Sequence, residues 1–225
     1  MAVFTSVTEN QAHELLQTYD LGHLQSLRGI SAGIENTNYF LDTDHGHYVL
    51  TLFEVLTDAE LPFYVELMHR LATQNVPVPM PQTRQDGTRI ARVHDKPAII
   101  VSKLPGQWVK APTVAHCRLA ALTMAQLHLA AQDYERQQPN LRGLPWWQAT
   151  APKLTDYLTN DQHALLRQAL NEQTALAQQA SWQSLPSGPA HCDFFRDNVL
   201  FTGTPEHPAM GGVIDFYFAG CDHWL

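Results

Sequence analysis

The sequence predicts an α+β protein with two lobes: a small N-terminal lobe built on an antiparallel sheet and a mostly helical C-terminal lobe. Three observations support this fold class. Short strand-like segments dominate up to residue 101, helical periodicity dominates after residue 113, and the chain-breaking stretch Ser102-Lys103-Leu104-Pro105-Gly106 lies between them. We therefore expect an N-terminal lobe over residues 1–101, a hinge over 102–106 and a C-terminal lobe over 107–225.

A short helix is predicted at the start of the N-terminal lobe. Thr8 and Gln11 have the spacing of a capping box, in which each side chain satisfies a free backbone N–H near the first helical turn. Apolar Leu15 and Leu16 follow at helical positions, and the helix is expected to end near the Gly22 turn.

Two strand pairs and a longer helix complete the predicted lobe. Each pair flanks a polar turn, and the first turn contains glycine, which favours an antiparallel hairpin. The four strands are expected at residues 39–41, 48–53, 90–93 and 97–101. Between the pairs, apolar side chains recur at helical spacing from Thr57, the expected N-cap, to an exit at Asn75.

The C-terminal lobe is predicted to be helical over residues 113–133 and 162–180, where apolar side chains again recur at helical spacing. Two apolar segments, Val199-Leu200-Phe201 and Val213-Ile214, follow these helices. Their composition predicts a pair of buried strands.

Composition excludes several classes of protein. The chain carries 14 Lys and Arg against 22 Asp and Glu, and this net charge of −8 repels a nucleic-acid backbone, so no nucleic-acid partner is expected. The 3 cysteines lie far apart without a CxxC pair, which argues against a disulfide framework or a zinc site and favours a reducing cytoplasm. No export signal and no membrane-spanning apolar run is present, so no membrane partner is expected.

The most informative stretch combines a polar loop with the two apolar strands. His191, Asp193 and Asn198 have the H-x-D-x-x-x-x-N spacing of a kinase catalytic loop, and Asp215 ends the second strand. Phosphoryl transfer needs a carboxylate to accept the proton of the attacking hydroxyl, and oxygen ligands to hold Mg²⁺ on the triphosphate. The pattern therefore predicts Asp193 as the base and Asn198 with Asp215 as the Mg²⁺ ligands.

A simpler alternative makes each of these residues a turn residue, since Asp and Asn are favoured in loops and at strand ends. The combination of a base, two oxygen ligands and two flanking apolar strands favours the catalytic interpretation. His191 is expected to act as a scaffold that hydrogen-bonds the loop backbone, without a direct chemical role.

The segments HCDFFRDNVLF and GVIDFYFAGCD resemble those of the aminoglycoside phosphotransferase-like kinases. This resemblance implies a two-lobed protein-kinase-like fold, ATP as the phosphoryl donor, and the roles already given to Asp193, Asn198 and Asp215. Other segments, among them GIENTNYFLDT, YVLTLFE, VPVPMP and NLRGLPWW, resemble the homoserine kinase branch, and the resemblance covers essentially the whole chain. It implies that L-homoserine is the substrate, in threonine biosynthesis.

Two features depart from the wider kinase pattern. Thr51 stands where most kinases carry the lysine that holds the α- and β-phosphates, so Glu66 in the following helix has no lysine partner. The chain also stops at Cys221-Asp222-His223-Trp224-Leu225, in an apolar context directly after the metal-binding strand. Because the resemblance implies further helices there, we expect the C-terminal lobe of this chain to be truncated.

Several residues are predicted to contact the nucleotide. The loop over residues 31–38 offers backbone N–H groups that would cradle the phosphates, and an ordinary Asn- and Gly-containing turn is the alternative. A hinge strand is expected to border the adenine through its backbone. The predicted nucleotide contacts are Gly33, Asn36, Asn38, Thr51, Val101 and Lys103.

Homoserine is a zwitterion, so a cation is expected near the catalytic loop to bind its carboxylate, a task that suits the arginine fork. Arg196 lies three residues after Asp193 and has a role at the transferring phosphate as its alternative; Arg142, the second candidate, has a surface role as its alternative. Trp146 and Trp147 are expected to pack in the core or between the lobes rather than to form a cation cage, because large aromatic side chains are usually buried.

Two other functions remain as alternatives. A related kinase acting on choline, an aminoglycoside or a thiosugar would share the catalytic loop, and a cationic substrate would favour an acidic pocket. A nucleotide-binding module without catalysis would agree with Thr51 and with the chain end, but the presence of Asp193, Asn198 and Asp215 argues against it.

Overall fold

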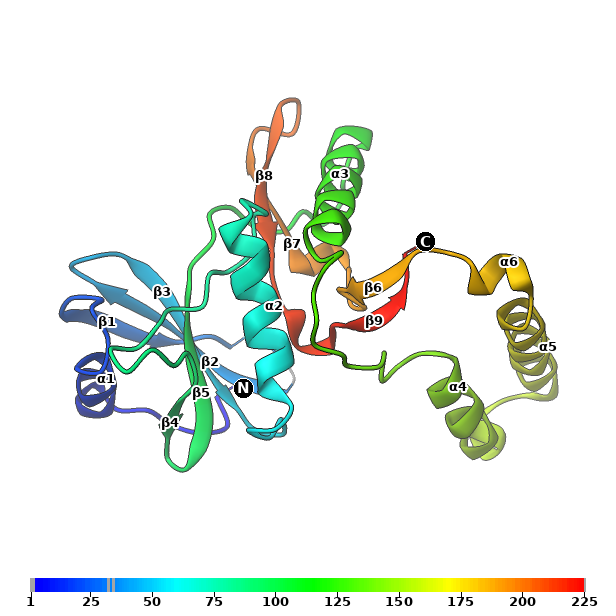
Figure 1. The fold of residues 1–225 in the computed structure, drawn as a ribbon, viewed down its shortest axis with the longest axis horizontal. Coiled ribbons are helices and arrows are strands. Elements are labelled where there is room, and N and C mark those ends of the chain that lie inside the picture. Colours follow the sequence, from blue (N-terminus) through cyan, green and yellow to red (C-terminus); the bar gives the residue numbers. More distant parts are fainter. Residues whose placement is uncertain (1–2, 32, 34, 225) are drawn as a thin grey trace.

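The N-terminal lobe is an antiparallel sheet. The computed structural model describes residues 3–31, 33 and 35–224, and within them this sheet has five strands in the order β1-β2-β3-β5-β4 (Figure 1). The strands are β1 Leu24–Gly29, β2 Asn36–Thr43, β3 His47–Phe53, β4 Ala91–Val93 and β5 Lys96–Ser102. Both predicted hairpins are confirmed. Strand β1 was not predicted, because none of its residues is buried and its sequence lacks apolar alternation.

The first helix, α1 (Glu9–Leu16), has the predicted capping box. The Thr8 hydroxyl accepts from the Gln11 backbone N–H, and the Gln11 side chain accepts from the Thr8 backbone N–H. The helix ends at Leu16, earlier than the predicted Gly22 turn, because the next N–H groups form tighter turns, Thr18 to the carbonyl of Leu15 and Tyr19 to that of Leu16.

The second helix, α2 (Leu61–Thr73), begins later than predicted. Thr57 is not its N-cap: its backbone N–H and hydroxyl donate to the Glu60 carboxylate at 2.9 and 2.7 Å, which forms a separate turn ahead of the helix. Pro62 is tolerated in the first turn because an N–H there has no partner within the helix. The predicted exit is confirmed by Asn75, whose φ of 63° is left-handed.

Strand β5 alternates between two hydrophobic clusters, one on each face of the sheet. Ala98 and Ile100 pack with α1, whereas Ile99 and Val101 pack with α2. The second cluster crosses between the lobes, since it also contains Leu127, Val213 and Phe216 from the C-terminal lobe. In Figure 1, α2 accordingly lies between the sheet and that lobe.

The C-terminal lobe combines helices with two small strand pairs. The predicted helices and the apolar strand pair are confirmed as α3, α5, β7 and β8. The pairing of β6 with β9 was not predicted, because these four-residue strands carry Gly or Pro and no apolar run. The bounds are α3 Val114–Ala130, α5 Asn160–Ala177, β6 Ser187–Ala190, β7 Val199–Gly203, β8 Pro208–Val213 and β9 Gly220–His223.

A peripheral group of helices extends beyond β9 in Figure 1. It comprises α5 together with α4 (Leu144–Thr150), the 3₁₀ helix η1 (Ala151–Tyr157) and α6 (Ala180–Gln183), and none of these four elements has a buried residue in the structure as described. The predicted burial of Trp146 and Trp147 is therefore wrong: they are 41% and 42% exposed, because α4 packs mainly against η1 and α5.

The residue directly after the predicted hinge is joined to the β7–β8 hairpin. Gln107 and Phe201 exchange two backbone hydrogen bonds, of 3.0 and 2.8 Å. Gly106 makes this approach possible, since it has φ 91° and a Cβ there would lie 2.3 Å from the Phe201 carbonyl oxygen. Strand β8 is also tied to the N-terminal lobe, where the Val213 N–H donates to the Pro77 carbonyl at 2.9 Å.

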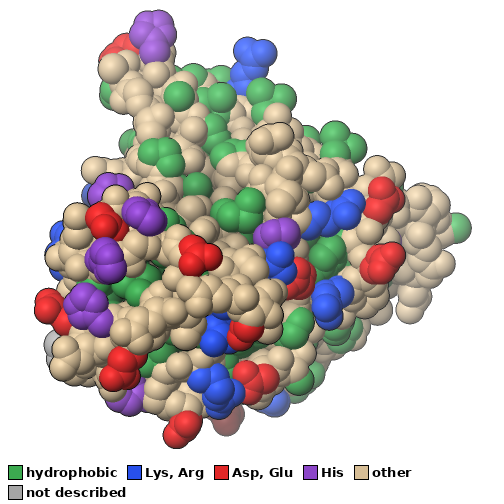
Figure 2. All heavy atoms as spheres, turned by 60° about the vertical axis from the view of Figure 1, so that its left-hand side comes forward, with side chains coloured by type: hydrophobic (Ala, Val, Ile, Leu, Met, Phe, Trp, Pro, Cys, Tyr) green, Lys and Arg blue, Asp and Glu red, His purple; other side chains and the backbone are tan. Residues whose placement is uncertain are grey.

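The surface of the N-terminal lobe mixes charges of both signs. Figure 2 shows acidic and basic side chains interspersed over this face, with several histidines among them. In the part of the chain that the structure describes, no helix is long and apolar enough to cross a bilayer.

Candidate active site

The loop between β6 and β7 brings Asp193 and Asn198 together. The Asn198 side-chain amide donates from Nδ2 to the Asp193 backbone carbonyl at 2.9 Å and to the Asp193 carboxylate at 3.0 Å. Because Nδ2 is used in this way, the amide flip is fixed and Oδ1 is left as an acceptor. The predicted spacing thus places a carboxylate and a free amide oxygen side by side.

His191 is a buried residue that hydrogen-bonds the backbone of this loop. It is only 3% exposed, its Nδ1 accepts from the Asp193 N–H at 3.2 Å, and its Nε2 donates to the Ile214 carbonyl at 2.9 Å. A backbone N–H can only donate and a carbonyl can only accept, so both bonds require the neutral Nε2–H tautomer. Burial lowers the pKa of His191, in agreement with a neutral ring. Its two hydrogen bonds join the segment that contains Asp193 to the segment that contains Ile214.

Asp215 follows β8 and turns toward the same loop. The Ile214 N–H donates to the Asn198 carbonyl at 2.9 Å, which fixes the end of β8 beside the catalytic loop. Asp215 itself has the left-handed φ of 66°, and Cys192, on the opposite segment, has φ 58°. Two non-glycine residues in this sparsely populated region mark a locally constrained site.

The carboxyl of Asp215 is in an acidic environment. Asp215 is exposed at the surface, but many protein atoms surround its carboxyl group. The desolvation that they cause is the largest reason that the pKa of Asp215 rises from the ordinary 3.8 to about 6. The negative charges of Asp193, Glu35 and Asp197 raise it further. Within the described residues, a cation is not among the causes of this shift.

The donor set of this site fits Mg²⁺. Asn198 Oδ1 and the Asp215 carboxylate are hard oxygen ligands, and neighbouring acids without a balancing cation favour a bound divalent ion. No group of three or more His, Cys, Asp and Glu side chains with metal-holding geometry occurs among the described residues. A pair of protein ligands is the usual arrangement where phosphate oxygens and waters complete the shell of Mg²⁺.

Thr51 does not face an acidic partner, as a kinase lysine would. Its hydroxyl donates to Asn38 Oδ1 at 2.7 Å and lies beside the hydroxyl of Tyr217, whose pKa it lowers against the larger rise caused by burial. The Tyr217 ring also packs edge-on against Phe53, with 4.9 Å between ring centroids. Strand β3 thereby holds the turn that carries Asp215.

Glu66, which would pair with that lysine in other kinases, has a different partner. Both of its carboxylate oxygens accept from Arg89 at 2.9 Å, on the side of α2 where His69 also contacts the guanidinium. The charge of Glu66 is therefore neutralised within the N-terminal lobe.

The predicted phosphate loop is shorter than expected. Asn36 and Asn38 belong to β2 and pair with Phe53 and Thr51, because the strand begins before the predicted Tyr39. Gly33 is exposed with φ 124°, and the loop residues 32 and 34 lie outside the described residues. Sequence reasoning missed Glu35 of this loop, whose charge acts on Asp215. The signal was visible in the sequence, because an acidic residue is unexpected beside residues that are predicted to contact phosphate.

The two predicted hinge residues differ in their environment. Val101 is buried in β5, whereas Lys103 follows the strand and is exposed. The Lys103 N–H donates to the His47 carbonyl at 3.0 Å, and its ammonium lies 4.7 Å from the centre of the Phe40 ring. This N–H is therefore already satisfied within the protein.

The two candidate arginines lie on different sides of the site. Arg196 donates from Nη1 to the Lys110 carbonyl at 3.0 Å, and its guanidinium is 5.9 Å from the Trp108 ring centre. Arg142 instead stacks between Trp146 and Phe218, at 5.0 and 5.6 Å from their ring centres.

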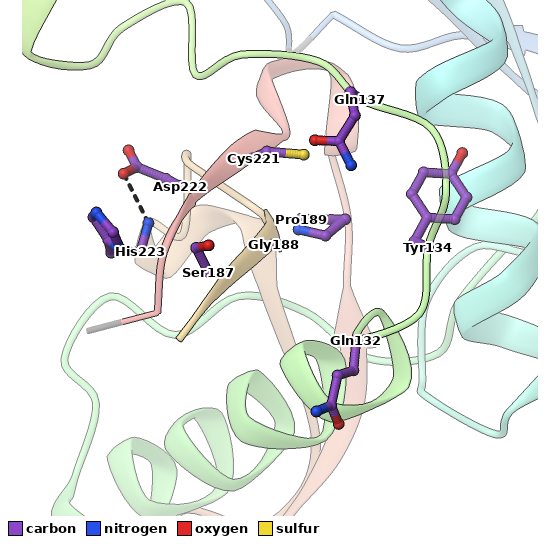
Figure 3. Close-up of a pocket in the computed structure, with 9 residues that line it drawn as sticks. All are labelled: Gln132, Tyr134, Gln137, Ser187, Gly188, Pro189, Cys221, Asp222 and His223. Carbon is purple, nitrogen blue, oxygen red and sulfur yellow. Dashed lines mark hydrogen bonds between the residues drawn. The ribbon is translucent and has the colours of Figure 1, made fainter. Parts of the chain in front are cut away.

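A cavity of about 370 Å³ lies on another side of β6 and β9, and none of the predicted catalytic groups lines it. In Figure 3, the Asp222 carboxylate accepts from the backbone N–H of His223 at its rim. The predicted base and the predicted metal ligands lie together on the other side, at Asp193, Asn198 and Asp215. The cavity residues are Gln132, Tyr134, Gln137, Ser187, Gly188, Pro189, Cys221, Asp222 and His223.

Comparisons with known proteins identify the family of this chain. The model of the phosphotransferase enzyme family matches residues 26–225. Homoserine kinase of Paraburkholderia phymatum is 51% identical and that of Burkholderia vietnamiensis 50% identical; each alignment covers 100% of this chain, and 71% and 69% of those proteins. An amicoumacin kinase, solved in complex with AMP-PNP and Ca²⁺, superposes with a TM-score of 0.68 at 16% identity, over 96% of this chain and 66% of that one.

Proposed function

This chain belongs to the phosphotransferase enzyme family, and from that premise we propose that it is a homoserine kinase, which transfers the γ-phosphoryl group of ATP to the side-chain hydroxyl of L-homoserine. The observation that carries the proposal is the contact of Asp193 with Asn198, beside Asp215, in a chain about half identical to homoserine kinases. The product is O-phospho-L-homoserine, an intermediate of threonine biosynthesis.

Asp193 is the proposed general base. Its carboxylate accepts the proton of the attacking hydroxyl as the oxygen bonds to phosphorus and the bond from phosphorus to the β–γ bridging oxygen breaks. Asn198 fixes the orientation of this carboxylate through its 3.0 Å hydrogen bond, and His191 fixes the backbone behind it. Positioning of this kind supplies much of the catalysis in phosphoryl transfer.

Asn198 Oδ1 and the Asp215 carboxylate are the proposed ligands of Mg²⁺, which supplies charge neutralisation on the phosphate oxygens. The αL turn directs Asp215, and Tyr217 anchors that turn to β3 through Phe53 and Thr51. Arg196 is proposed at the transferring phosphate, since it is on the catalytic loop and only one of its donors is used by Lys110.

The N-terminal lobe is proposed to hold the nucleotide. Gly33 is near the phosphates, and Asn38 with Thr51 lies on the strands that face the Asp215 turn. Val101 and Lys103 border the adenine in this proposal, and Asn36 completes the phosphate contacts. We also propose a cytoplasmic location, which the free thiols of the cysteines support.

An assay of ADP release tests the acceptor. The protein is supplied with ATP, Mg²⁺ and one acceptor from a panel of L-homoserine, L-serine, choline and an aminoglycoside. We expect turnover with homoserine to exceed turnover with every other acceptor, and O-phospho-L-homoserine to be identified by mass spectrometry. Preference for choline or an aminoglycoside would assign the chain to a related kinase, and nucleotide binding without any turnover would make it a binding module.

A further inference from the structure

Arg142 lies against two aromatic rings and has no ion-pair partner among the described residues. Arg142 is exposed, and within the described residues no carboxylate lies at ion-pair distance from it. Its guanidinium lies over the rings of Trp146 and Phe218, at 5.0 and 5.6 Å from their centres, so cation–π contacts hold the group in place. These contacts use none of its N–H donors, which can therefore bind the two oxygens of a carboxylate.

The backbone that carries Arg142 is fixed at several points. Asn140 accepts from the Arg142 N–H at 2.9 Å through Oδ1, and donates from Nδ2 to the Asp222 carboxylate at 2.6 Å. The chain before it pairs with β9, where the Cys221 N–H donates to the Gln138 carbonyl at 2.6 Å. Gly220 allows this close approach, since a Cβ there would lie 2.8 Å from the Asn140 Cα.

The same contacts place Arg142 on the catalytic side of the lobe. Phe218, on which it stacks, follows the proposed metal ligand Asp215 by three residues in the same turn. Gly220, against which its support packs, accepts a long contact of 3.8 Å from the thiol of Cys192, the neighbour of Asp193. These contacts therefore link Arg142 both to the turn that carries Asp215 and to the loop that carries Asp193.

We propose that Arg142 binds the α-carboxylate of the amino-acid substrate, with Trp146 and Phe218 as the platform that orients its guanidinium. The proposal rests on the proposed homoserine kinase activity, which it deepens by naming the residue that selects an amino acid over a simple amino alcohol. Only two methylene groups and the α-carbon separate the hydroxyl of homoserine from its carboxylate, so both ends are bound within one site. Arg196 is the less suitable candidate for the carboxylate, because its remaining donors are proposed to bind the transferring phosphate.

Two substrates separate this role from a structural one. 3-Aminopropan-1-ol keeps the hydroxyl and the amine of homoserine at the same spacing but lacks the carboxylate. In the full chain, Arg142→Gln should raise KM for homoserine roughly 10- to 100-fold, the loss expected for a charge-assisted hydrogen-bonded pair. KM for ATP and kcat/KM for 3-aminopropan-1-ol should stay within about twofold of the wild type.

Further variants make the test specific. Arg142→Lys should have a KM for homoserine between those of Arg142→Gln and the wild type, because an ammonium keeps the charge but not the bidentate geometry. Arg118→Gln, at another exposed arginine of the same lobe, should change none of these constants. Thermal unfolding of each variant, compared with that of the wild type, identifies a variant that has lost its fold.

The outcomes are distinguishable. Loss of homoserine affinity alone, with 3-aminopropan-1-ol unaffected, supports the proposal. Equal losses for both acceptors in a folded Arg142→Gln protein, or the homoserine-specific loss in Arg196→Gln instead, would overturn it while leaving the kinase activity intact. A wild-type protein that does not phosphorylate homoserine would overturn the proposed function itself.

Discussion

Acidic residues are treated differently in the two regions of this molecule. In the N-terminal lobe, Asp42 accepts from His47 at 2.7 Å and from Ser26 at 2.8 Å, and these hydrogen bonds hold its pKa below the ordinary value. Around the catalytic loop, Asp215 is surrounded by other acids, and desolvation with their negative charges raises its pKa to about 6. The ionised form of aspartate is therefore stabilised at Asp42 in the N-terminal lobe and destabilised at Asp215 beside the catalytic loop.

The same difference distinguishes the acids of the N-terminal lobe from the acids of the proposed active site. Burial of the Glu54 carboxylate would raise its pKa, but the hydrogen bonds from Lys96 and from Thr37 outweigh it, and the pKa is lowered. For Asp215 the hydrogen bond from the Tyr217 backbone N–H lowers the pKa, but desolvation and the charges of the neighbouring acids outweigh it, and the pKa is raised. A cation bound beside these acids would lower the pKa of Asp215.

The largest expected effect concerns the base. Asp193→Asn keeps the shape of the side chain and a hydrogen-bonding group for Asn198, but it cannot accept a proton. Turnover of homoserine should fall by roughly 10²–10⁴-fold, with little change in nucleotide affinity. Steady-state ADP release and nucleotide titration measure the two quantities.

The neighbouring acid in the same loop provides the matched control for this variant. Asp197→Asn removes an equal charge at an exposed position, and its effect on turnover should be much smaller. Near-normal turnover in Asp193→Asn would remove this residue from the mechanism, and similar losses in both variants would show that only the charge of the loop matters.

The second effect concerns the metal. Asp215→Ala removes a proposed ligand while the other nucleotide contacts remain, so the Mg²⁺ concentration needed for half-maximal activity should rise roughly 10-fold or more. A titration of activity with Mg²⁺ at fixed ATP measures this shift. An unchanged Mg²⁺ dependence would contradict the assignment.

Sequence reasoning succeeded where the determining pattern is local. The capping box of α1 and the spacing from His191 to Asn198 lie within a few residues of one another, and the structure contains both features. It failed for β1 and for the β6–β9 pair, whose partners are set by contacts between distant segments. Glu35 and the stack on Arg142 were missed for the same reason, because only the fold brings Glu35 to Asp215 and Phe218 to Arg142.

The third effect tests the compensated acids of the N-terminal lobe. Glu54→Gln keeps an acceptor for Thr37 but loses the ion pair with Lys96, and Glu54 is largely shielded from water with 12% of its side chain exposed. We expect a loss of about 1 kcal/mol in the free energy of unfolding, measured by urea denaturation at pH 7. Glu206→Gln, at an exposed acid with no ion pair among the described residues, should change it by less than about 0.5 kcal/mol. Equal losses of stability in the two variants would mean that the ion pair with Lys96 does not stabilise the charge of Glu54.

The smallest effect has the opposite sign and concerns the uncompensated acid. The pKa of Asp215 is about 6 in the folded protein and near 3.8 in the unfolded chain, so the folded state binds more protons between these values. Its contribution to stability is therefore full below pH 4 and is lost as the pH rises through 6. Asp215→Asn does not titrate and accommodates the left-handed φ of 66°, so it escapes this loss.

In metal-free protein with a chelator present, Asp215→Asn should thus unfold at a higher temperature than the wild type at pH 7 to 8. The gap should be smaller than that caused by Glu54→Gln, because the exposed surface of Asp215 allows solvent to screen its charge. It should close as the pH falls from about 6 toward 4. If Mg²⁺ with a nucleotide is then added at pH 7.5, the order should reverse, because only the wild type retains the carboxylate that is proposed to bind the metal. A variant that is less stable than the wild type without metal, or a gap that does not depend on pH, would show that Asp215 is as well compensated as the acids of the N-terminal lobe.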